Sequence, residues 1–359
     1  MTEPDRLDFL THLTTELVSD GLRREFNNVD RVRFSSSSSS STYFKEWALG
    51  LAASLGFYRA AAIDRGLLRE VLKTDGLDHA YSLLQDQLSR DLFVKLLAYR
   101  VLGHQQVRLP LNNEQYWKAR QSVEKYVEKR GTVSGIPILG SLDLFDFKGI
   151  RLQAHALNIL NTFLLEQYRC ARAGIGVREG DVVIDAGGCW GDTALYFAQK
   201  ASQVFCFECM PSNIKIIDEN MAMNTDLRGK VKVIQKALWS RPQERLVFKD
   251  TGPGSRPSSD DGGLEVETET LDRFVAVNSL ERVDFIKMDI EGSEPEALVG
   301  AEQTIRKYRP RLAISLYHDV GHFGSIPRWI ANLDLGYRLY LDHFTIHAEE
   351  TVLFARSDL

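Results

Sequence analysis

One glycine-rich stretch, residues 181–198, constrains the fold more than any other part of the chain. It reads DVVIDAGGCWGDTALYFA: an apolar run ends at an acid, Asp185, and Gly187, Gly188 and Gly191 follow at once. The apolar run predicts a buried strand, the glycines predict a tight turn, and the residues after them have helical spacing. The stretch therefore predicts the strand–turn–helix unit with which open α/β sheets bind nucleotides.

Two acids indicate which nucleotide this unit binds. A carboxylate at Asp185 would repel a pyrophosphate on the helix N-terminus, but it suits a ligand with an ammonium and a sulfonium group. Glu208 lies 23 residues further on, at the end of the next apolar run, where it can accept both ribose hydroxyls of an adenosine. The two acids together predict S-adenosylmethionine as the cofactor. The other residues expected to bind it are Asp192, Asn213 and Ala237.

Apolar runs and amphipathic segments alternate after residue 180, which indicates a parallel sheet with helical crossovers. A further helix is expected over 152–169, where Gln167 and Tyr168 could reach the cofactor, although packing against the sheet edge is the preferred interpretation. The insertion 245–268 predicts two short strands around a mobile loop. The expected strands are 182–186, 204–208, 231–238, 284–290, 311–317, 337–342 and 350–355, and the expected helices are 192–200, 212–223 and 294–307.

Helical spacing dominates the chain up to about residue 130. The seven-serine run 35–41 predicts a surface linker, and the breaker-rich segment 131–141 predicts a domain boundary. Apolar residues recur with a helical period on both sides of the linker's end and further on. They are Phe44, Trp47, Ala48, Leu51 and Leu55, then Leu77, Ala80, Tyr81, Leu84 and Leu88, and then Phe93, Leu97 and Val101.

Candidate catalytic residues follow the last two apolar runs of the parallel part. Asp289 and Glu291 come at the end of one run, and His318 and Asp319 come at the end of the next. Asp289 could orient an acceptor hydroxyl or take its proton, or it could hold a divalent cation such as Mg²⁺ together with Asp319. His318, with an ordinary pKa of about 6.5, would be a largely neutral general base. A surface histidine without chemistry is the alternative.

At these residues a family becomes visible. The segments VVIDAGGCWGDTALYFA, FECMPSN, FIKMDIEGSEPEALVGA and ETVLFA resemble the FkbM family of methyltransferases, in the same order over about 150–359. The resemblance implies a Rossmann-like class I methyltransferase fold, in which a mostly parallel seven-stranded sheet carries a closing antiparallel strand. It also implies S-adenosylmethionine-dependent O-methylation of a hydroxyl on a sugar, glycan or natural product. We therefore expect an N-terminal helical region over 1–140, for acceptor recognition or oligomerisation, and a methyltransferase domain over 141–359.

The resemblance also assigns residues. It implies that Asp185, Gly187, Gly191 and Glu208 bind the cofactor and that Asp289 lies beside the transferred methyl group. The chain departs from the family at Cys189-Trp190, where members commonly have Ala-Asn. A tryptophan beside the methionine moiety is expected to reshape that part of the pocket.

Composition narrows the partners. The net charge of −5 and the absence of a long basic run argue against nucleic acid, which leaves a small-molecule or glycan acceptor. The acidic start lacks the apolar core of a signal peptide, and no apolar run reaches the length of a membrane span, so a cytoplasmic protein is expected, with a homo-oligomer left open. Three alternatives remain: a binding module with the methyltransferase fold, an N-methyltransferase, and a nicotinamide-dependent oxidoreductase. Glu208 would suit a nicotinamide-dependent oxidoreductase, but this chain lacks the G-x-G-x-x-G pattern of such enzymes.

Overall fold

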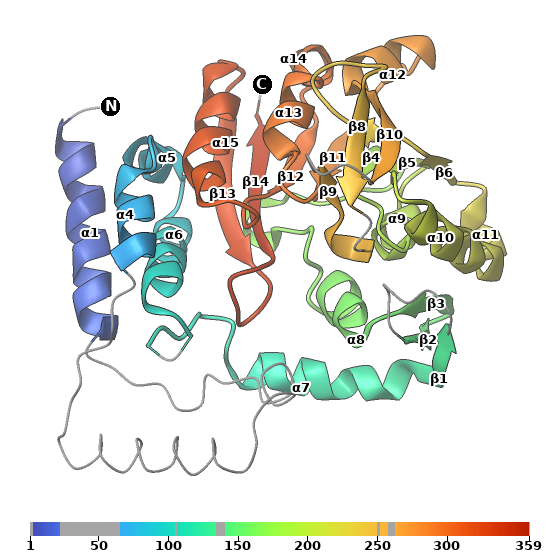
Figure 1. Ribbon diagram of the computed structural model, residues 1–359, viewed down its shortest axis with the longest axis horizontal. Coiled ribbons are helices and arrows are strands. Elements are labelled where there is room, and N and C mark those ends of the chain that lie inside the picture. The colour runs from blue at the N-terminus through green and yellow to red at the C-terminus, as the bar shows by residue number, and fades with distance from the viewer. Residues whose placement is uncertain are drawn as a thin grey trace.

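A seven-stranded sheet forms the centre of the carboxyl-terminal part of the chain (Figure 1). The computed structural model describes residues 3–21, 65–104, 106–133, 141–249, 252–257 and 263–358. The strands of the sheet are β4 (Val182–Ala186), β5 (Gln203–Phe207), β6 (Val231–Ile234), β11 (Phe285–Met288), β12 (Arg311–Ser315), β13 (Tyr337–His343) and β14 (Thr351–Ser357). Their spatial order is β13-β14-β12-β11-β4-β5-β6, and β14 alone runs antiparallel to its neighbours. The predicted sheet with one closing antiparallel strand is confirmed.

The central strands are buried on both faces, which explains their continuous apolar runs. Successive side chains of a strand point to opposite faces. On β11, Ile286 and Met288 belong to one buried apolar cluster, whereas Phe285 belongs to another. Helices cover both faces of the sheet (Figure 1). They are α9 (Asp192–Ala198), α10 (Pro211–Met223), α11 (Thr225–Arg228), α12 (Leu271–Val277), α13 (Glu294–Val299), α14 (Glu302–Tyr308) and α15 (Val320–Asn332).

Two predicted elements are interrupted. The expected strand 231–238 ends at Ile234, because the chain turns there, and β7 (Ala237–Leu238) pairs instead with β10 (Leu264–Glu269) in a second sheet of order β7-β10-β8-β9. The expected helix 294–307 divides at Gly300, where a Cβ atom would lie 2.0 Å from the carbonyl oxygen of Trp239. The helix breaks where another loop's backbone packs against it.

The insertion forms the two strands that were predicted. β8 (Arg245–Lys249) pairs antiparallel with β10, and the short β9 (Arg256–Pro257) pairs with β8. Residues 250–251 and 258–262 of the expected mobile loop lie outside the described residues.

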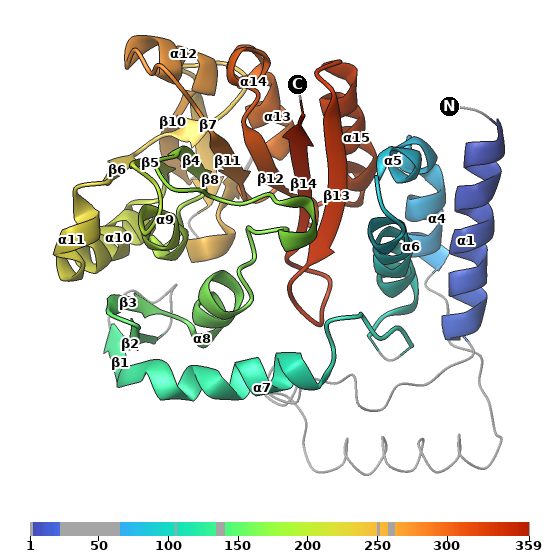
Figure 2. The ribbon, with the colours of Figure 1, turned by 180° about the vertical axis from the view of Figure 1, so that it is seen from behind.

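The described N-terminal helices are α1 (Glu3–Gly21), α4 (Arg65–Lys73), α5 (Leu77–Leu83), α6 (Gln87–Leu102) and α7 (Glu114–Ser122). The helices α5 and α6 pack beside α15 and β13, and α1 and α4 pack in turn on these two helices (Figure 2). Leu84 forms a backbone bridge with Leu339 of β13, and the Phe93 ring lies 5.7 Å from that of Phe323 on α15. The apolar positions predicted over 77–101 are buried except Leu88, so the helical pattern is confirmed there. The serine run 35–41 and the helix expected at 44–55 lie outside the described residues.

A small antiparallel sheet between α7 and β4 was not predicted. It contains β1 (Val127–Val133), β2 (Leu142–Phe147) and β3 (Ile150–Ala154). Two asparagines of the α10 region bond the backbone of β3: Asn220 accepts from the Gln153 N–H at 2.7 Å, and Asn224 accepts from the Arg151 N–H at 3.0 Å. The helix expected from residue 152 therefore begins only after β3, as α8 (Ala156–Asn158), and continues as a wider helical segment over 159–164. Among the described residues, no helix has the length and apolar character needed to cross a membrane.

Candidate active site

The glycine turn brings the ends of two parallel strands together. Gly187 has a φ of 82°, and a Cβ atom there would lie 1.8 Å from the carbonyl oxygen of Asp289. The N–H groups of Gly187 and Gly188 donate to the Phe207 carbonyl at 2.9 and 3.0 Å, and the Gly191 N–H donates to the Gly188 carbonyl at 2.7 Å. No side chain fits at Gly187, so the turn can pack directly on the backbone that carries Asp289. This packing assembles the carboxyl edge of the sheet, where α/β folds bind ligands.

Asp185 lies behind this turn. Its buried carboxylate accepts a hydrogen bond from the Thr193 hydroxyl at 2.7 Å and pairs with the Lys287 ammonium at 3.1 Å. The Lys287 ammonium also donates to the Ala186 carbonyl at 3.0 Å, and the Asp185 and Asp289 charges, opposing the effect of burial, raise its pKa. Asp185 is fully buried and lines neither of the two cavities described below, and its charge is paired with Lys287. Its predicted role in choosing the cofactor stays a prediction.

A first cavity, partly open to solvent, lies beside the turn. Glu208 lies in its wall, where its carboxylate accepts three backbone N–H groups, from Cys189 at 2.9 Å and from Cys209 and Met210 at 2.8 Å each. Burial raises the pKa of Glu208, against the lowering effect of those N–H groups. Most of the residues predicted for the cofactor gather here. The cavity is lined by Gly187, Glu208, Asn213, Ala237 and Asp289, among others.

A second cavity, of about 910 Å³, adjoins the first, and the walls of both include Gly187, Cys189, Asp289 and Glu291. Asp192 lines the second cavity and accepts a hydrogen bond from the Thr162 hydroxyl at 2.6 Å. Burial raises the pKa of Asp192. The two cavities therefore meet at the end of β11, where the sequence predicts the chemistry.

The tryptophan at the family departure is part of the wall rather than an obstruction. The Trp190 side chain is 1% exposed and donates from Nε1 to the Asn213 side-chain oxygen at 3.2 Å. Its ring lies edge-on to the His155 ring, with 4.8 Å between the ring centroids. The neighbouring Cys189 has a φ of 47° and contacts Glu208 through its backbone N–H.

Asp289 is held by two tyrosines. Its carboxylate accepts hydrogen bonds from the Tyr168 hydroxyl at 2.7 Å and from the Tyr317 hydroxyl at 2.9 Å. Burial alone would raise the pKa of Asp289, but the charges of His318 and Lys287 and these hydrogen bonds lower it. Asp289 is therefore a fixed anion where the cavities meet. Tyr168 is buried as the preferred interpretation expects, but its hydroxyl also reaches into the site.

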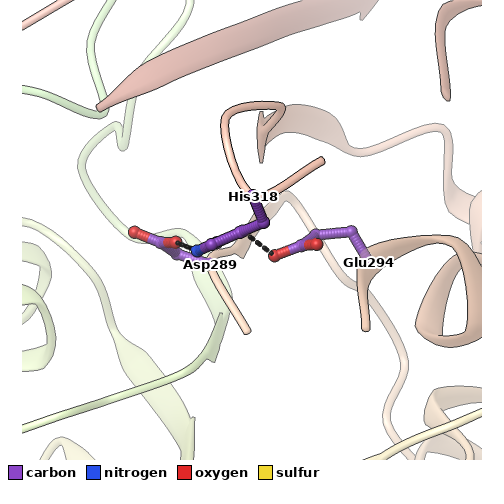
Figure 3. Close-up of side chains that lie close together, drawn as sticks. All are labelled: Asp289, Glu294 and His318. Carbon is purple, nitrogen blue, oxygen red and sulfur yellow. Dashed lines mark ion pairs between the residues drawn. The ribbon is translucent and has the colours of Figure 1, made fainter. Parts of the chain in front are cut away.

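His318 lies among three carboxylates, and Figure 3 shows two of them, Asp289 and Glu294. Its Nδ1 lies 2.9 Å from Glu294, and its Nε2 lies 3.5 Å from both Asp289 and Glu291. Burial lowers the pKa of His318, but these acids outweigh burial and raise it to about 11. The side chain is thus an imidazolium at neutral pH, and the prediction of a neutral general base is wrong. Glu294, the first residue of α13, is fully buried and accepts the Ile290 N–H at 2.8 Å.

One group of described residues has the spacing of a metal site: Asp289, Glu294 and His318 each offer a ligand atom, and all lie within 4.8 Å of one another. This set fits magnesium poorly, because Mg²⁺ prefers oxygen ligands and the histidine here carries a proton. Asp319 does not belong to the group. Its exposed carboxylate accepts the Gly321 N–H at 2.7 Å and caps α15, contrary to its predicted place as a ligand.

Sequence reasoning missed Glu350, which lines the second cavity. Its carboxylate accepts a hydrogen bond from the Gln167 side chain, and burial together with the Asp289 charge raises its pKa to about 8. Glu350 directly precedes β14, and because that strand is antiparallel its first residue lies at the carboxyl edge of the other strands. The predicted antiparallel strand from residue 350 could therefore have indicated Glu350 as a site residue.

The sheet order and the cavities at its carboxyl edge define a Rossmann-like class I methyltransferase fold. Residues 165–339 match the family described as the methyltransferase FkbM domain, which confirms the resemblance for this part of the chain. A 2-O-methyltransferase, NoeI, of Sinorhizobium fredii is 27% identical over 150 residues, covering 36% of this chain and 60% of NoeI.

A solved structure has the same fold. The crystal structure of methyltransferase FkbM from Methylobacillus flagellatus superposes with a TM-score of 0.51 at 17% identity. The match covers 78% of this chain and 57% of that chain. This chain therefore spans less than two thirds of either relative's length.

Proposed function

We propose that this protein is an S-adenosylmethionine-dependent O-methyltransferase that acts on a hydroxyl of a sugar or glycan. The observation that carries the proposal is the junction of two cavities at Asp289 and Glu291. A transferase needs two binding spaces that share one point, because donor and acceptor must be aligned there. Such alignment can supply roughly 7–11 kcal/mol of the barrier.

The first cavity suits the adenosine part of the cofactor. Glu208, held by three backbone N–H groups, presents a fixed carboxylate to two ribose hydroxyls. Ala237, Leu238 and Phe248 give the same cavity an apolar wall against which an adenine ring would pack. The residues shared by both cavities, Gly187 and Cys189 among them, would border the methionine part. The bound cofactor supplies an activated methyl group.

The second cavity supplies the acceptor's environment. Asn158, Asn161 and Thr162 line it with neutral hydrogen-bonding groups, which suit hydroxyls. Glu350 is the proposed proton acceptor, because a pKa of about 8 lies close to neutral pH and its carboxylate faces the cavity. Asp289, which lines both cavities and keeps its charge at neutral pH, would orient the acceptor, and the His318 imidazolium beside it would hold Asp289 in place. The printed name of NoeI, a 2-O-methyltransferase, also favours oxygen over nitrogen as the atom that is methylated.

Ligand-induced stabilisation tests the cofactor. S-adenosylhomocysteine at about 100 times its Kd should stabilise the protein by about 2.7 kcal/mol, whereas NAD should not. Glu208→Ala should abolish the shift, and Glu179→Ala, which removes an exposed carboxylate outside both cavities, should leave it unchanged. A shift with NAD alone would favour the oxidoreductase alternative.

Transfer of labelled methyl groups then tests the reaction. Neutral saccharides should become labelled, and the label should remain after amine-specific derivatisation of the product. Cofactor binding without transfer to any saccharide, peptide or small alcohol would favour a binding module. Transfer to amines alone would favour an N-methyltransferase.

A further inference from the structure

A third cavity extends the second toward the surface. It has a volume of about 1,110 Å³, and its walls come from α7, from residues 155–161 and from the segment 345–350. We call it the outer groove. His155, Leu157, Asn161 and Glu350 line both the outer groove and the second cavity. A path bounded by side chains therefore leads from Asp289 past Glu350 to α7.

The chemistry of the outer groove favours a neutral, hydroxyl-rich occupant. Glu349 and Glu350 offer carboxylates, and Asn161 offers an amide, groups that hold hydroxyls well. Arg120 is the single arginine or lysine among the lining residues, and Glu349 offsets its charge, so the walls lack the positive excess that phosphate-rich polymers require. Leu157, which is 48% exposed, adds an apolar surface against which the C–H face of a sugar ring would pack.

Contacts within the protein hold parts of two walls of the outer groove. Asn113 caps α7 by accepting the Gln115 and Tyr116 N–H groups at 2.9 and 3.1 Å. The Arg120 guanidinium lies 5.8 Å from the Trp117 ring, which fixes its position along the helix. On the opposite wall, His155 packs on Trp190. Because little order has to be gained on binding, such walls lower the entropic cost of holding a flexible chain.

We propose that the outer groove binds the sugar units of an oligosaccharide acceptor that lie beyond the unit being methylated. This inference rests on the proposed function. It gives α7, which precedes the methyltransferase sheet, a direct role in acceptor recognition. It also predicts that the enzyme selects acceptors of two or more units over free monosaccharides.

The test compares acceptors of different length. We would measure kcat and KM with mono-, di- and tetrasaccharides of glucose, N-acetylglucosamine, mannose and rhamnose, using labelled S-adenosylmethionine. The best tetrasaccharide should have a KM at least about tenfold below that of its monosaccharide, which corresponds to about 1.4 kcal/mol. Arg120→Ala should raise the KM for the tetrasaccharide about tenfold, as expected for the loss of a hydrogen bond from a charged group, and leave the monosaccharide KM unchanged.

Two further variants make the comparison specific. Ala156→Phe changes an exposed residue that lines the outer groove and not the second cavity, so it should fold normally and raise the tetrasaccharide KM by filling the groove. Lys118→Ala changes an exposed residue of the same helix α7 outside the groove and should change neither KM. All variants should bind S-adenosylhomocysteine like the wild type.

Equal KM values for long and short acceptors, or variants that affect both equally, would overturn the groove assignment while leaving methyl transfer intact. Failure of the proposed function would differ from this result. In that case S-adenosylhomocysteine would not bind, or no saccharide of any length would be labelled.

Discussion

Replacing Glu350 with glutamine is the sharpest test of the proton acceptor, because the structure gives this carboxyl group a pKa of about 8. The amide keeps the size of the side chain and can still bond Gln167, but it cannot accept a proton from a hydroxyl. General-base catalysis contributes about 10²- to 10⁴-fold to a rate. Glu350→Gln should therefore lower kcat by at least about a hundredfold and leave the affinity for S-adenosylhomocysteine nearly unchanged.

The pH profile gives the magnitude. With a pKa of about 8, roughly one tenth of the Glu350 carboxyl groups are ionised at pH 7 and roughly nine tenths at pH 9. The wild-type kcat/KM should thus rise about tenfold over this interval, and the Glu350→Gln profile should be flat. His318, with a pKa of about 11, does not titrate in this window and cannot cause the rise. A flat wild-type profile between pH 7 and 9, or a variant with full activity, would refute the assignment.

Stability provides a check that needs no acceptor. The folded pKa of Glu350 is raised from 4.5 to about 8, so the folded protein holds a proton that the unfolded chain releases between these values. The stabilising effect of that proton is complete below about pH 4.5 and is lost as pH rises through about 8. The free energy of unfolding of the wild type, relative to Glu350→Gln, should therefore fall between pH 5 and 8 and stay constant above. A constant difference over the whole range would show that the pKa is ordinary.

Three further substitutions test the turn and its neighbours. Gly187→Ala should destabilise the protein by at least about 2 kcal/mol in urea unfolding, because its Cβ would lie 1.8 Å from the Asp289 carbonyl; Gly180→Ala, with a φ of 80° and open space around it, should cost less. Lys287→Met should lower the free energy of unfolding by about 3–5 kcal/mol, because it leaves Asp185 buried and unpaired. Adding Asp185→Asn should restore part of that stability. Equal stability of the single and double variants would contradict this pairing. Asp289→Asn should reduce turnover more than S-adenosylhomocysteine binding. It should also move the midpoint of the activity–pH profile below pH 8, because the Asp289 charge raises the pKa of Glu350. An unchanged midpoint would disprove this effect of Asp289 on Glu350.

The parallel part of the fold was predictable because each of its strands is a local pattern. The strands β4, β5, β11 and β12 are mostly apolar, since helices bury both faces of the sheet. The small sheet β1–β3 was missed because the apolar residues from 152 onward were interpreted as one helix, although β2 and β3 pair as neighbours across the short turn at Lys148-Gly149. Asn220 and Asn224 supply bonds to the backbone of β3, and nothing in the sequence near residue 152 signals them.

The candidate site also has parts that the sequence could predict and parts that it could not. The glycine turn and Glu208 could be found from spacing, because a short segment of chain determines their geometry. The charge of His318 could not, because it depends on Glu294, which is buried at the start of α13. A histidine after a strand is neutral or charged according to its neighbours, and only the packing of α13 against α15 brings the buried acid to it.

The departure from the family pattern at Cys189-Trp190 can now be interpreted from its contacts. Cys189 reaches Glu208 through its backbone N–H, so many side chains at this position would leave that contact in place. Trp190 acts through its side chain, because its ring supports His155, a wall of both the second cavity and the outer groove. Its Nε1 also fixes Asn213 in the first cavity. A smaller residue at position 190 would therefore free His155 and widen the path to α7. The departure thus bears on acceptor selection more than on the choice of cofactor.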